Sequence, residues 1–383
     1  MAFLDVHAIQ AVPPANINRD ESGSPKTAVY GGTRRLRVSS QAWKRAARKA
    51  LEADSARVQA SERTKRLPER IAASLAERAP ALADTAADIA QAALASVFRV
   101  KTNAKKDRLA TDYLLFLGVD QRDRLVDVLV ENADTLAGAA GDAKKLDAAL
   151  KGLALRDTVA TGHPAAVALF GRMVATDPTL NVDAACQVAH ALSTHRVDAE
   201  FDYYTAVDDV DNASDETGAG MIGTVEFNAA TMYRCASVDL RSLHHNLGGD
   251  TEAATSTATA FVRAFLLSMP TGKRNTFANN TRPDFALLSL RDDQPVSLAA
   301  AFEEAVYGDK GHLGRSVARL VEHHAQQDGC WGTSPVLCRA VYPAWVGERA
   351  TGAGTGLPES TDLPSALDEI GARVRAMIGG ADV

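Results

Sequence analysis

The amino-acid sequence predicts an α+β protein, and three observations lead to that prediction. Segments with the two-residue alternation of β-strands occur near the N-terminus and again in the second half of the chain. Amphipathic helical segments stand between them. An alanine-rich block over residues 55–155 has apolar residues at helical spacing and interrupts this order. Interleaved strands and helices around an inserted helical block are typical of the α+β class.

The N-terminal residues 3–12 are compatible with a β-strand whose odd-numbered and even-numbered residues face opposite ways. Pro13 and Pro14 are expected to end this strand. Residues 15–33 are rich in Asn, Asp, Ser, Gly and Pro, and we predict a long loop there. A short strand is expected over residues 34–38.

A helix is predicted from Gln41 to Leu51, with Ser39 or Ser40 as its N-cap. At about 100° per residue, its apolar and basic residues fall on opposite arcs. The apolar arc comprises Trp43, Ala46, Ala47, Ala50 and Leu51, and the basic arc comprises Lys44, Arg45, Arg48 and Lys49. We therefore expect one face to pack and the other to form a continuous basic stripe.

The second half of the chain continues the mixed pattern. Helices are expected over residues 183–194, 250–269, 297–307 and 312–327, and strands over residues 224–240 and 285–290. The Gly-, Thr- and Pro-rich segment 351–363 is predicted to be a linker before a last amphipathic helix.

The net charge of the chain hides an uneven distribution. The 383 residues include 42 Lys and Arg and 48 Asp and Glu, a formal charge of −6. Residues 26–49 hold eight basic and no acidic side chains, whereas residues 197–220 hold eight acidic and no basic ones. The acidic stretch lacks a helical period and is expected to be an extended loop or a hairpin. A local basic patch on an acidic chain suggests one anionic partner and discourages indiscriminate binding.

Three interpretations of the basic patch remain open: a solvated charged face, a helix that binds an acidic membrane or protein, and a phosphate-binding surface. Phosphate binding is favoured by the hydroxyl and amide groups of Ser39, Ser40 and Gln41, which stand where helical N–H groups point outward. Gly31 and Gly32 offer a flexible approach to the patch. The mixture of Arg and Lys suits contacts to a nucleic-acid backbone.

Other classes of protein are disfavoured. The chain has no P-loop, hydrolase nucleophile elbow, zinc-protease or EF-hand motif. Its cysteines form no CxxC pair and its histidines lack ligand spacing, so we expect neither a metal site nor a cofactor. No apolar run approaches the about 18 residues needed to cross a bilayer, and no signal peptide is recognisable. A cytoplasmic protein with no membrane partner is therefore expected.

Several blocks of sequence follow one another in the order and spacing of a known family. They are Asn18-Arg19-Asp20, Tyr30 to Gln41, Lys44-Arg45-Ala46, Ala189 to Asp198, Thr205 to Asp209, Gly223 to Phe227, Asn246 to Gly249 and Gly272 to Thr276. In these blocks the chain closely resembles the CasC family, the backbone subunit of Cascade, the type I-E CRISPR surveillance complex. The resemblance is strong over residues 1–51 and about 163–310, and loose elsewhere.

The resemblance implies an architecture of the RAMP superfamily. A modified ferredoxin-like core of the RNA-recognition-motif type, the palm, would comprise residues 1–54 and 163–350. Residues 55–162 would be a helical insertion, the fingers. Residues 196–224 would form a β-hairpin within the palm, the thumb, and residues 351–383 a linker and C-terminal helix.

The same resemblance implies the partners. Several copies would stack along one crRNA, and each thumb would displace one base at regular intervals. The remaining bases would pair with the target DNA strand. The large, small, crRNA-processing and capping subunits of Cascade would complete the complex.

Roles for individual residues are also implied. Contacts to the guide backbone are expected from Arg19, Lys26, Ser39, Gln41, Lys44, Arg45 and Arg48, and a second basic contact from Lys273 and Arg274. Arg34 and Arg35 join this set because they lie in the basic patch. Met173, Tyr203 and Tyr204 match positions that pack against the bases around the displaced one, where an unstacked base needs a flat or soft partner.

The sequence departs from the family pattern at three of these places. Thr33 and Arg48 stand where relatives can carry lysine, which could weaken or reshape a phosphate contact. Tyr203 stands where tryptophan can occur, and stacking should remain intact.

The leading hypothesis is a non-catalytic RNA-binding scaffold that protects crRNA and presents it for pairing. The alternative is a metal-dependent RNA endonuclease of the RAMP type that uses Asp20, with His7 as the nearest possible general base. A single aspartate without a second carboxylate at metal spacing is weak support for metal-ion catalysis. A third class, a membrane-surface protein, would use the helix of residues 41–51.

Overall fold

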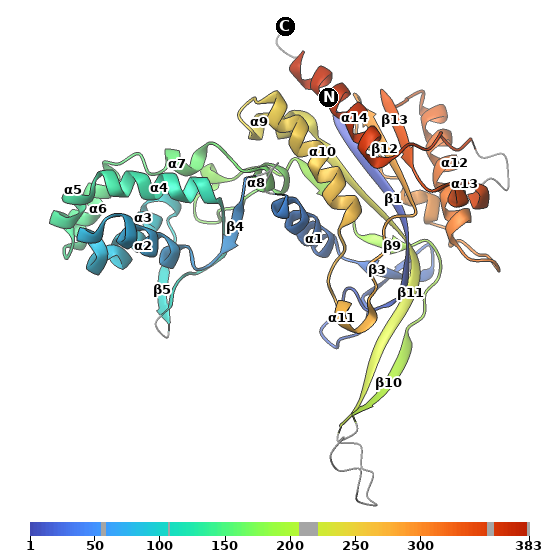
Figure 1. Cartoon of the computed structure of the whole chain (residues 1–383), viewed down its shortest axis with the longest axis horizontal. Helices are drawn as coiled ribbons and strands as arrows, with labels where there is room; N and C mark the ends of the chain where they lie inside the picture. Colours follow the sequence, from blue (N-terminus) through green and yellow to red (C-terminus); the bar gives the residue numbers. More distant parts are fainter. Residues whose placement is uncertain (55–58, 106–107, 207–220, 351–355, 381–383) are drawn as a thin grey trace, which may run out of the picture.

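The computed structural model describes residues 1–54, 59–105, 108–206, 221–350 and 356–380, and its architecture is α+β, as predicted (Figure 1). The strands are β1 (Phe3–Ala15), β2 (Thr27–Tyr30), β3 (Thr33–Val38), β4 (Ser61–Thr64), β5 (Thr102–Lys105), β6 (Arg108–Thr111), β7 (Leu115–Gly118), β8 (Cys186–Val188), β9 (Ala191–Ser193), β10 (Glu200–Ala206), β11 (Met221–Asp239), β12 (Phe285–Arg291) and β13 (Leu337–Val341).

The helices lie on both faces of the main sheet and in a separate lobe. They are α1 (Ser40–Ala53), α2 (Leu67–Arg78), α3 (Ala86–Phe98), α4 (Val119–Glu131), α5 (Ala133–Ala139), α6 (Ala143–Lys151), α7 (Asp157–Ala160), α8 (Ala165–Phe170), α9 (Leu240–Asn246), α10 (Thr251–Leu267), α11 (Arg274–Phe277), α12 (Leu313–Trp331), α13 (Ala344–Ala350) and α14 (Leu363–Gly379). Short 3-10 turns are η1 (Pro80–Thr85), η2 (Pro178–Leu180) and η3 (Ala299–Phe302).

The main sheet has nine strands in the order β13-β12-β1-β11-β9-β3-β2, with β8 and β10 also paired to β11. All of its strand pairs are antiparallel. β11, at 19 residues, is its longest strand and pairs with β1, β8, β9 and β10. This one strand therefore connects the interior of the sheet to the hairpin that leaves it.

Strand β1 is buried on both faces, and the predicted alternation separates two hydrophobic cores. Leu4, Val6 and Ala8 lie in a core with α1, α10 and α14. Ile9 lies in the opposite core, beneath α12 and α13. The prediction that Pro13 and Pro14 end the strand is wrong, because the register shifts between Val12 and Ala15 and the ladder resumes. Prolines are tolerated at such irregularities.

The predicted helical block forms a lobe with its own hydrophobic core (Figure 1). Helices α2 to α7 supply most of this core, and Val174 and Leu180 belong to it as well. The prediction of helices is confirmed, but the block also contains two small sheets, β4–β7 and β5–β6. Because its core is separate, the lobe does not depend on the main sheet for burial of its apolar side chains.

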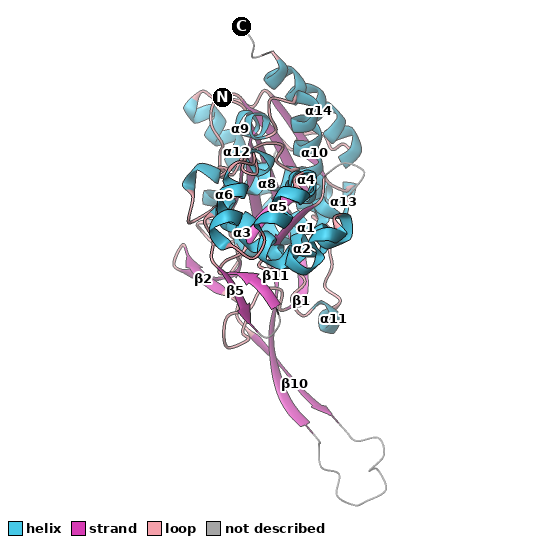
Figure 2. Cartoon of the chain, turned by 90° about the vertical axis from the view of Figure 1, so that its left-hand side faces the viewer, coloured by secondary structure: helices cyan, strands magenta, loops and turns pink. Residues whose placement is uncertain are grey.

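Strands β10 and β11 form a hairpin that projects from the main sheet (Figures 1 and 2). The prediction of a hairpin or extended loop in the acidic stretch is therefore confirmed where the structure describes it. Residues 207–220, which hold five of the eight acidic side chains of the stretch, lie outside the described residues.

Two other sequence predictions are wrong. Residues 183–194 contain strands β8 and β9 instead of a helix, because both pair with β11. Residues 297–307 contain only the short turn η3. The predicted loop over residues 15–33 also includes strand β2, which pairs with β3. Elements whose apolar period is carried over ten or more residues, such as α1, α10 and α12, were predicted correctly.

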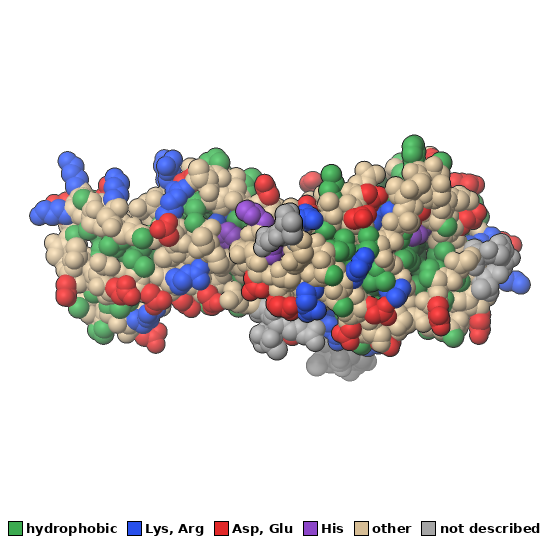
Figure 3. All heavy atoms as spheres, turned by 90° about the horizontal axis from the view of Figure 1, so that it is seen from above, with side chains coloured by type: hydrophobic (Ala, Val, Ile, Leu, Met, Phe, Trp, Pro, Cys, Tyr) green, Lys and Arg blue, Asp and Glu red, His purple; other side chains and the backbone are tan. Residues whose placement is uncertain are grey.

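The face opposite the hairpin mixes both signs of charge with apolar side chains (Figure 3). Within the described residues, no helix combines the length and the apolarity that crossing a membrane requires.

Buried neutral histidines make the stability of the fold dependent on pH. Burial lowers the pKa of His7 to about 3, and of His163 and His195 to about 4. The Tyr233 hydroxyl accepts the Leu298 N–H and lies 3.0 Å from His7 Nδ1, so its own proton is available to that nitrogen.

We predict that the free energy of unfolding falls as the pH drops from about 6.5 towards 4, because the unfolded chain binds protons that the folded chain excludes. His7 alone contributes a slope of up to about 1.4 kcal/mol per pH unit. Urea unfolding of the wild type and of His7→Phe should show a shallower slope for the variant in this window and parallel curves above pH 7. Equal slopes at acid pH would contradict the assignment.

Candidate nucleic-acid interface

Two neighbouring arginines of β3, for which the sequence analysis expected the same RNA contact, lie in different environments. Arg34 is exposed, whereas Arg35 is fully buried. The Arg35 guanidinium donates to the carbonyl oxygens of Ser193, Phe302 and Glu303 at 3.0–3.1 Å. The expectation that Arg35 contacts RNA is therefore corrected, since its side chain ties the hairpin to the segment after η3.

The start of helix α1 is held by three side chains. The Ser39 hydroxyl accepts the Ala42 N–H and confirms the predicted N-cap. Asn18 Oδ1 accepts the Ser39 N–H at 2.8 Å, and His190 Nδ1 accepts the Ser40 N–H at 3.0 Å. The Ser39 side chain is buried and serves the cap, whereas Gln41 is exposed beside it. His190 is exposed at this helix start, and sequence reasoning considered it only as a metal ligand.

The outer face of α1 is less uniform than predicted. Trp43, Ala47 and Leu51 are buried, and Lys44 and Arg45 stay accessible. Arg48 pairs with Glu52 at 2.7 Å and lies over the Phe116 ring of the helical lobe, with only 16% of its side chain exposed. The expectation of a continuous basic stripe is therefore wrong, because Arg48 contacts Glu52 and Phe116 of the same chain. A sequence signal existed, because Glu52 follows Arg48 by four residues.

The loop before β2 packs against both α1 and the hairpin. The Asn16 side-chain amide donates to the carbonyl oxygens of Gly23 and Glu226. Arg19 is exposed in this loop, and Lys26 is half-buried, its backbone bonded to Asn18 and Arg37. The loop thus presents two cations beside the root of the β10–β11 hairpin.

Lys273 and Arg274 lie at the start of α11, which approaches the same loop. A Cβ atom at Gly272 would lie 2.4 Å from the Ile17 carbonyl oxygen, so only glycine permits this approach. The Phe277 ring lies 5.8 Å from that of Phe227 in β11. Arg274 is exposed and Lys273 half-buried.

These contacts bring four segments to one edge of the sheet: the loop of residues 16–26, β3, the start of α1, and the α11 turn. None of their cations forms an ion pair with a described acidic side chain, apart from Arg48 and Lys49 with Glu52. The unpaired ones are Arg19, Lys26, Arg34, Arg37, Lys44, Arg45, Lys273 and Arg274. A surface of unpaired cations from separate segments suits an extended anion.

The hairpin presents aromatic rings. Tyr203 pairs with Thr224, and Tyr204 pairs with Gly223. The Tyr204 ring covers Gly223 so closely that a Cβ atom there would lie 2.4 Å from its hydroxyl. Phe201, which the sequence analysis did not single out, is 67% exposed on the same face as Tyr203.

Met173 is 78% exposed and lies at a different place. It follows buried Arg172, whose guanidinium donates to the carbonyl oxygens of Leu180 and Val159. Burial lowers the pKa of Arg172 to about 10. This turn follows α8, at the junction with the helical lobe, far from β10 in Figure 1. One chain therefore does not bring Met173 and the hairpin tyrosines together.

The groups required for cleavage are not assembled. Asp20 is exposed, and its carboxylate accepts the N–H groups of Ser22 and Ser24 and the Ser22 hydroxyl, which lowers its pKa. His7 is buried in the sheet interior. No group of three or more His, Cys, Asp or Glu side chains in the described part of the chain is placed to hold a metal ion.

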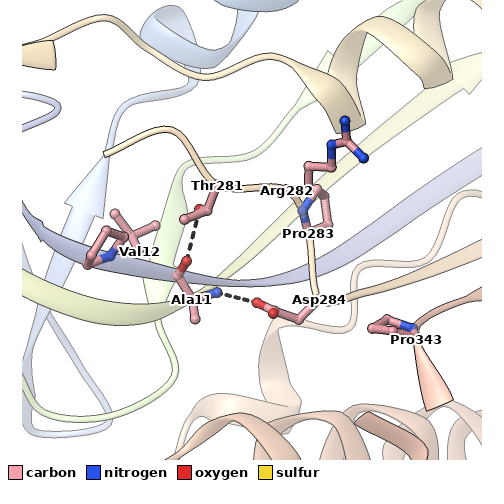
Figure 4. Close-up of a pocket in the computed structure, with 8 residues that line it drawn as sticks. Ala11, Val12, Thr281, Arg282, Pro283, Asp284 and Pro343 are labelled. Carbon is pink, nitrogen blue, oxygen red and sulfur yellow. Dashed lines mark hydrogen bonds between the residues drawn. The ribbon is translucent and has the colours of Figure 1, made fainter. Parts of the chain in front are cut away.

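A cavity of about 750 Å³ lies at the end of β1 (Figure 4). Val12, Pro13, Pro283 and Pro343 make it largely apolar. The Asp284 carboxylate in this cavity accepts the Ala11 N–H at 2.7 Å and so satisfies a backbone donor near the end of β1. The cavity is open to solvent, and its carboxylate is already engaged by the backbone.

We predict opposite behaviour for the two neighbouring arginines. Arg35→Met removes the donor from the carbonyl oxygens of Ser193, Phe302 and Glu303, the first two of them in buried hydrogen bonds, and should lower the free energy of unfolding by about 3 kcal/mol. Arg34→Met, one residue away and exposed, should change it by less than about 0.5 kcal/mol. Chemical denaturation of both variants checks this. Similar stability losses would show that Arg34 also has a structural role.

Comparisons with known proteins agree with this architecture. The family model described as "CT1975-like protein" matches residues 4–364. A chain of a "CRISPR RNA-guided surveillance complex, pre-nicking" is 34% identical, with a TM-score of 0.82, and the match covers 97% of this chain and 100% of that one. A chain of another "CRISPR RNA-guided surveillance complex" is 31% identical, with a TM-score of 0.69, covering 99% and 100%. No curated protein matches. The extent of the family match shows that this chain belongs to the CT1975-like protein family.

Proposed function

We propose that this chain is a non-catalytic scaffold that binds crRNA through its cationic edge and presents it for pairing with target DNA in CRISPR defence. The observation that carries the proposal is the convergence of unpaired cations from four segments on one edge of an otherwise acidic chain. Two surveillance-complex chains share its fold over nearly its whole length.

The chemistry of the edge favours backbone recognition. Lys and Arg side chains attract phosphates whatever the base, and the start of α1 adds a helix dipole of the same sign. A scaffold for guides of many sequences requires affinity without base specificity. The contacts proposed are Arg19, Lys26, Arg34, Gln41, Lys44, Arg45, Lys273 and Arg274, with Ser39 as the helix cap.

The division into palm, fingers and thumb belongs to this proposal. The separate core of the helical lobe supports fingers over residues 55–162, and the continuous sheet supports a palm of residues 1–54 and 163–350. The thumb would be residues 196–224, and the tail residues 351–383. We further propose that the complex is of type I-E and the fold a member of the RAMP superfamily.

Self-assembly follows from the separation of the base-contacting groups. Met173 and Tyr203 and Tyr204 lie on different parts of one chain, so a single base could meet both only where two copies adjoin. We therefore propose that several copies stack along one crRNA, together with the large, small, crRNA-processing and capping subunits. Within the complex the protein would be cytoplasmic.

Two alternatives have less support. A nuclease using Asp20 and His7 lacks an assembled site, because one is an exposed loop cap and the other is buried. A membrane-surface role for α1 would not explain the unpaired cations of the other three segments.

We predict that Lys44→Glu with Arg45→Glu weakens RNA binding. Two lost phosphate contacts should reduce the slope of log K against log salt by about 1.4 for single-stranded RNA. The helix should persist, because glutamates near its start are favoured by the dipole. Filter binding at several salt concentrations is the measurement.

The matched control for this pair is Lys144→Glu with Lys145→Glu, an equal charge change on exposed lysines of α6. Normal RNA affinity in the α1 variant, or an equal loss in the control, would contradict the placement of the interface.

We also predict that the purified complex leaves bound RNA intact in the presence of Mg²⁺, and that Asp20→Ala changes nothing in this assay. Metal-dependent cleavage that disappears in Asp20→Ala would establish the endonuclease instead.

The direct test is the nucleic-acid content of the protein purified from cells that express a CRISPR array. Sequencing should return spacer RNA flanked by repeat. Protein free of RNA, even with partner subunits present, would refute the scaffold.

A further inference from the structure

The helical lobe and the main sheet meet at a small apolar cluster. Their hydrophobic cores are separate, and the short helix α8 lies between them (Figure 1). Ala166 and Val167 of α8 pack on Phe116 of β7, whereas other buried side chains of α8 belong to the core of the main sheet. A contact of this size does not by itself fix two folded units relative to each other.

An ion pair of helix α1 stands beside this cluster. Arg48 Nη1 lies 2.7 Å from Glu52 Oε1, and only 16% and 12% of the two side chains are exposed. The Arg48 guanidinium also lies 5.6 Å from the centre of the Phe116 ring. Helix α1 is itself anchored in the core of the main sheet by Trp43 and Leu51. The pair is therefore carried by the main sheet and contacts the lobe through a ring.

The Glu52 carboxylate extends this contact to a second strand of the lobe. Its Oε1 atom accepts the hydroxyl proton of Ser61, the first residue of β4. Strands β4 and β7 pair with each other, with Arg63 opposite Phe116. One ion pair of α1 thus contacts both strands of the small sheet at which the lobe begins.

An arginine suits this place better than a lysine. A planar guanidinium can pair with a carboxylate at its edge and lie on an aromatic ring with its face. A largely buried ion pair is also held firmly, because either partner alone would be left as an uncompensated charge. Lys49, the other cation near Glu52, lies 3.9 Å away with 61% of its side chain exposed, and a pair of that kind contributes little.

We propose that Arg48 is a positioning residue that fixes the helical lobe relative to the main sheet through Glu52 and Phe116. The inference concerns the chain without RNA and does not rest on the proposed scaffold function. It assigns Arg48 to the joint between two folded units instead of to a phosphate contact. Because Lys44 and Arg45 lie on the same helix, α1 would set the distance from the cationic edge to the lobe.

The test is pulsed EPR on the full chain without RNA. Spin labels are attached at Lys144→Cys in α6 of the lobe and at Ser256→Cys in α10 on the main sheet, two exposed positions. Cys330→Ser and Cys338→Ser remove the native thiols that are not buried. With the joint intact, the labels should give a single narrow distance distribution.

Arg48→Met and Glu52→Gln should each shift or broaden this distribution. The double variant should add little to either change, because both substitutions remove the same contact. Glu52→Gln keeps an acceptor for Ser61 and supplies the test even if Arg48→Met does not fold, which circular dichroism would show.

Lys44→Met is the matched control, since it removes a cation one turn away on the same helix and should leave the distribution unchanged. A narrow and unshifted distribution in Glu52→Gln would overturn the joint, as would an equal change in Lys44→Met.

RNA binding distinguishes a joint from a phosphate contact. The slope of log K against log salt should be unchanged in Arg48→Met and should fall by about 0.7 in Lys44→Met, the value for one phosphate contact of single-stranded RNA. A fall of that size in Arg48→Met would overturn the assignment of Arg48. No fall in Lys44→Met would count against the proposed interface instead, while the distance measurement still decides the joint.

Discussion

The buried guanidinium of Arg234 joins the three elements on which the candidate interface depends. Arg234 lies in β11, the strand that continues into the hairpin, and donates to the carbonyl oxygens of Phe265 and Leu266 at the end of α10. Its guanidinium also lies 4.3 Å from the Trp43 ring of α1. Burial lowers its pKa to about 9, so the charge is retained at neutral pH. A buried cation needs such partners, because leaving it unpaired costs several kcal/mol.

This arrangement places the cationic helix relative to the hairpin. Trp43 packs inward against Arg234, so Lys44 and Arg45 stay on the accessible side of α1, and Asn18 of the loop of residues 16–26 accepts the Ser39 N–H at the start of this helix. Asn16 bonds that loop to the hairpin root, and Gly272 lets the α11 turn approach it. The cations thus occupy fixed positions on a rigid edge, although each comes from a different segment. Such preorganisation reduces the ordering cost of binding an extended polyanion.

The β10–β11 hairpin and the cationic edge differ in their chemistry. The edge supplies positive charge, and the hairpin supplies exposed aromatic rings and acidic side chains. A strand that crosses both would keep its phosphates on the edge and offer bases to the hairpin. Met173 lies on a turn beside the separate core of the helical lobe, to which its neighbour Val174 belongs.

The α+β class, the amphipathic helix α1, the uneven charge and the family motifs could be predicted before the structure, because helical period, capping and charge runs are local properties. Which of the two adjacent arginines is buried could not be predicted, because the carbonyl oxygens that accept from Arg35 lie more than 150 residues away in the chain. Strands β8 and β9 could not be predicted either, because they form by hydrogen bonding to β11, which is distant in the sequence. Phe201 and Tyr203 share one face of the hairpin because β10 pairs with β11 as a regular strand.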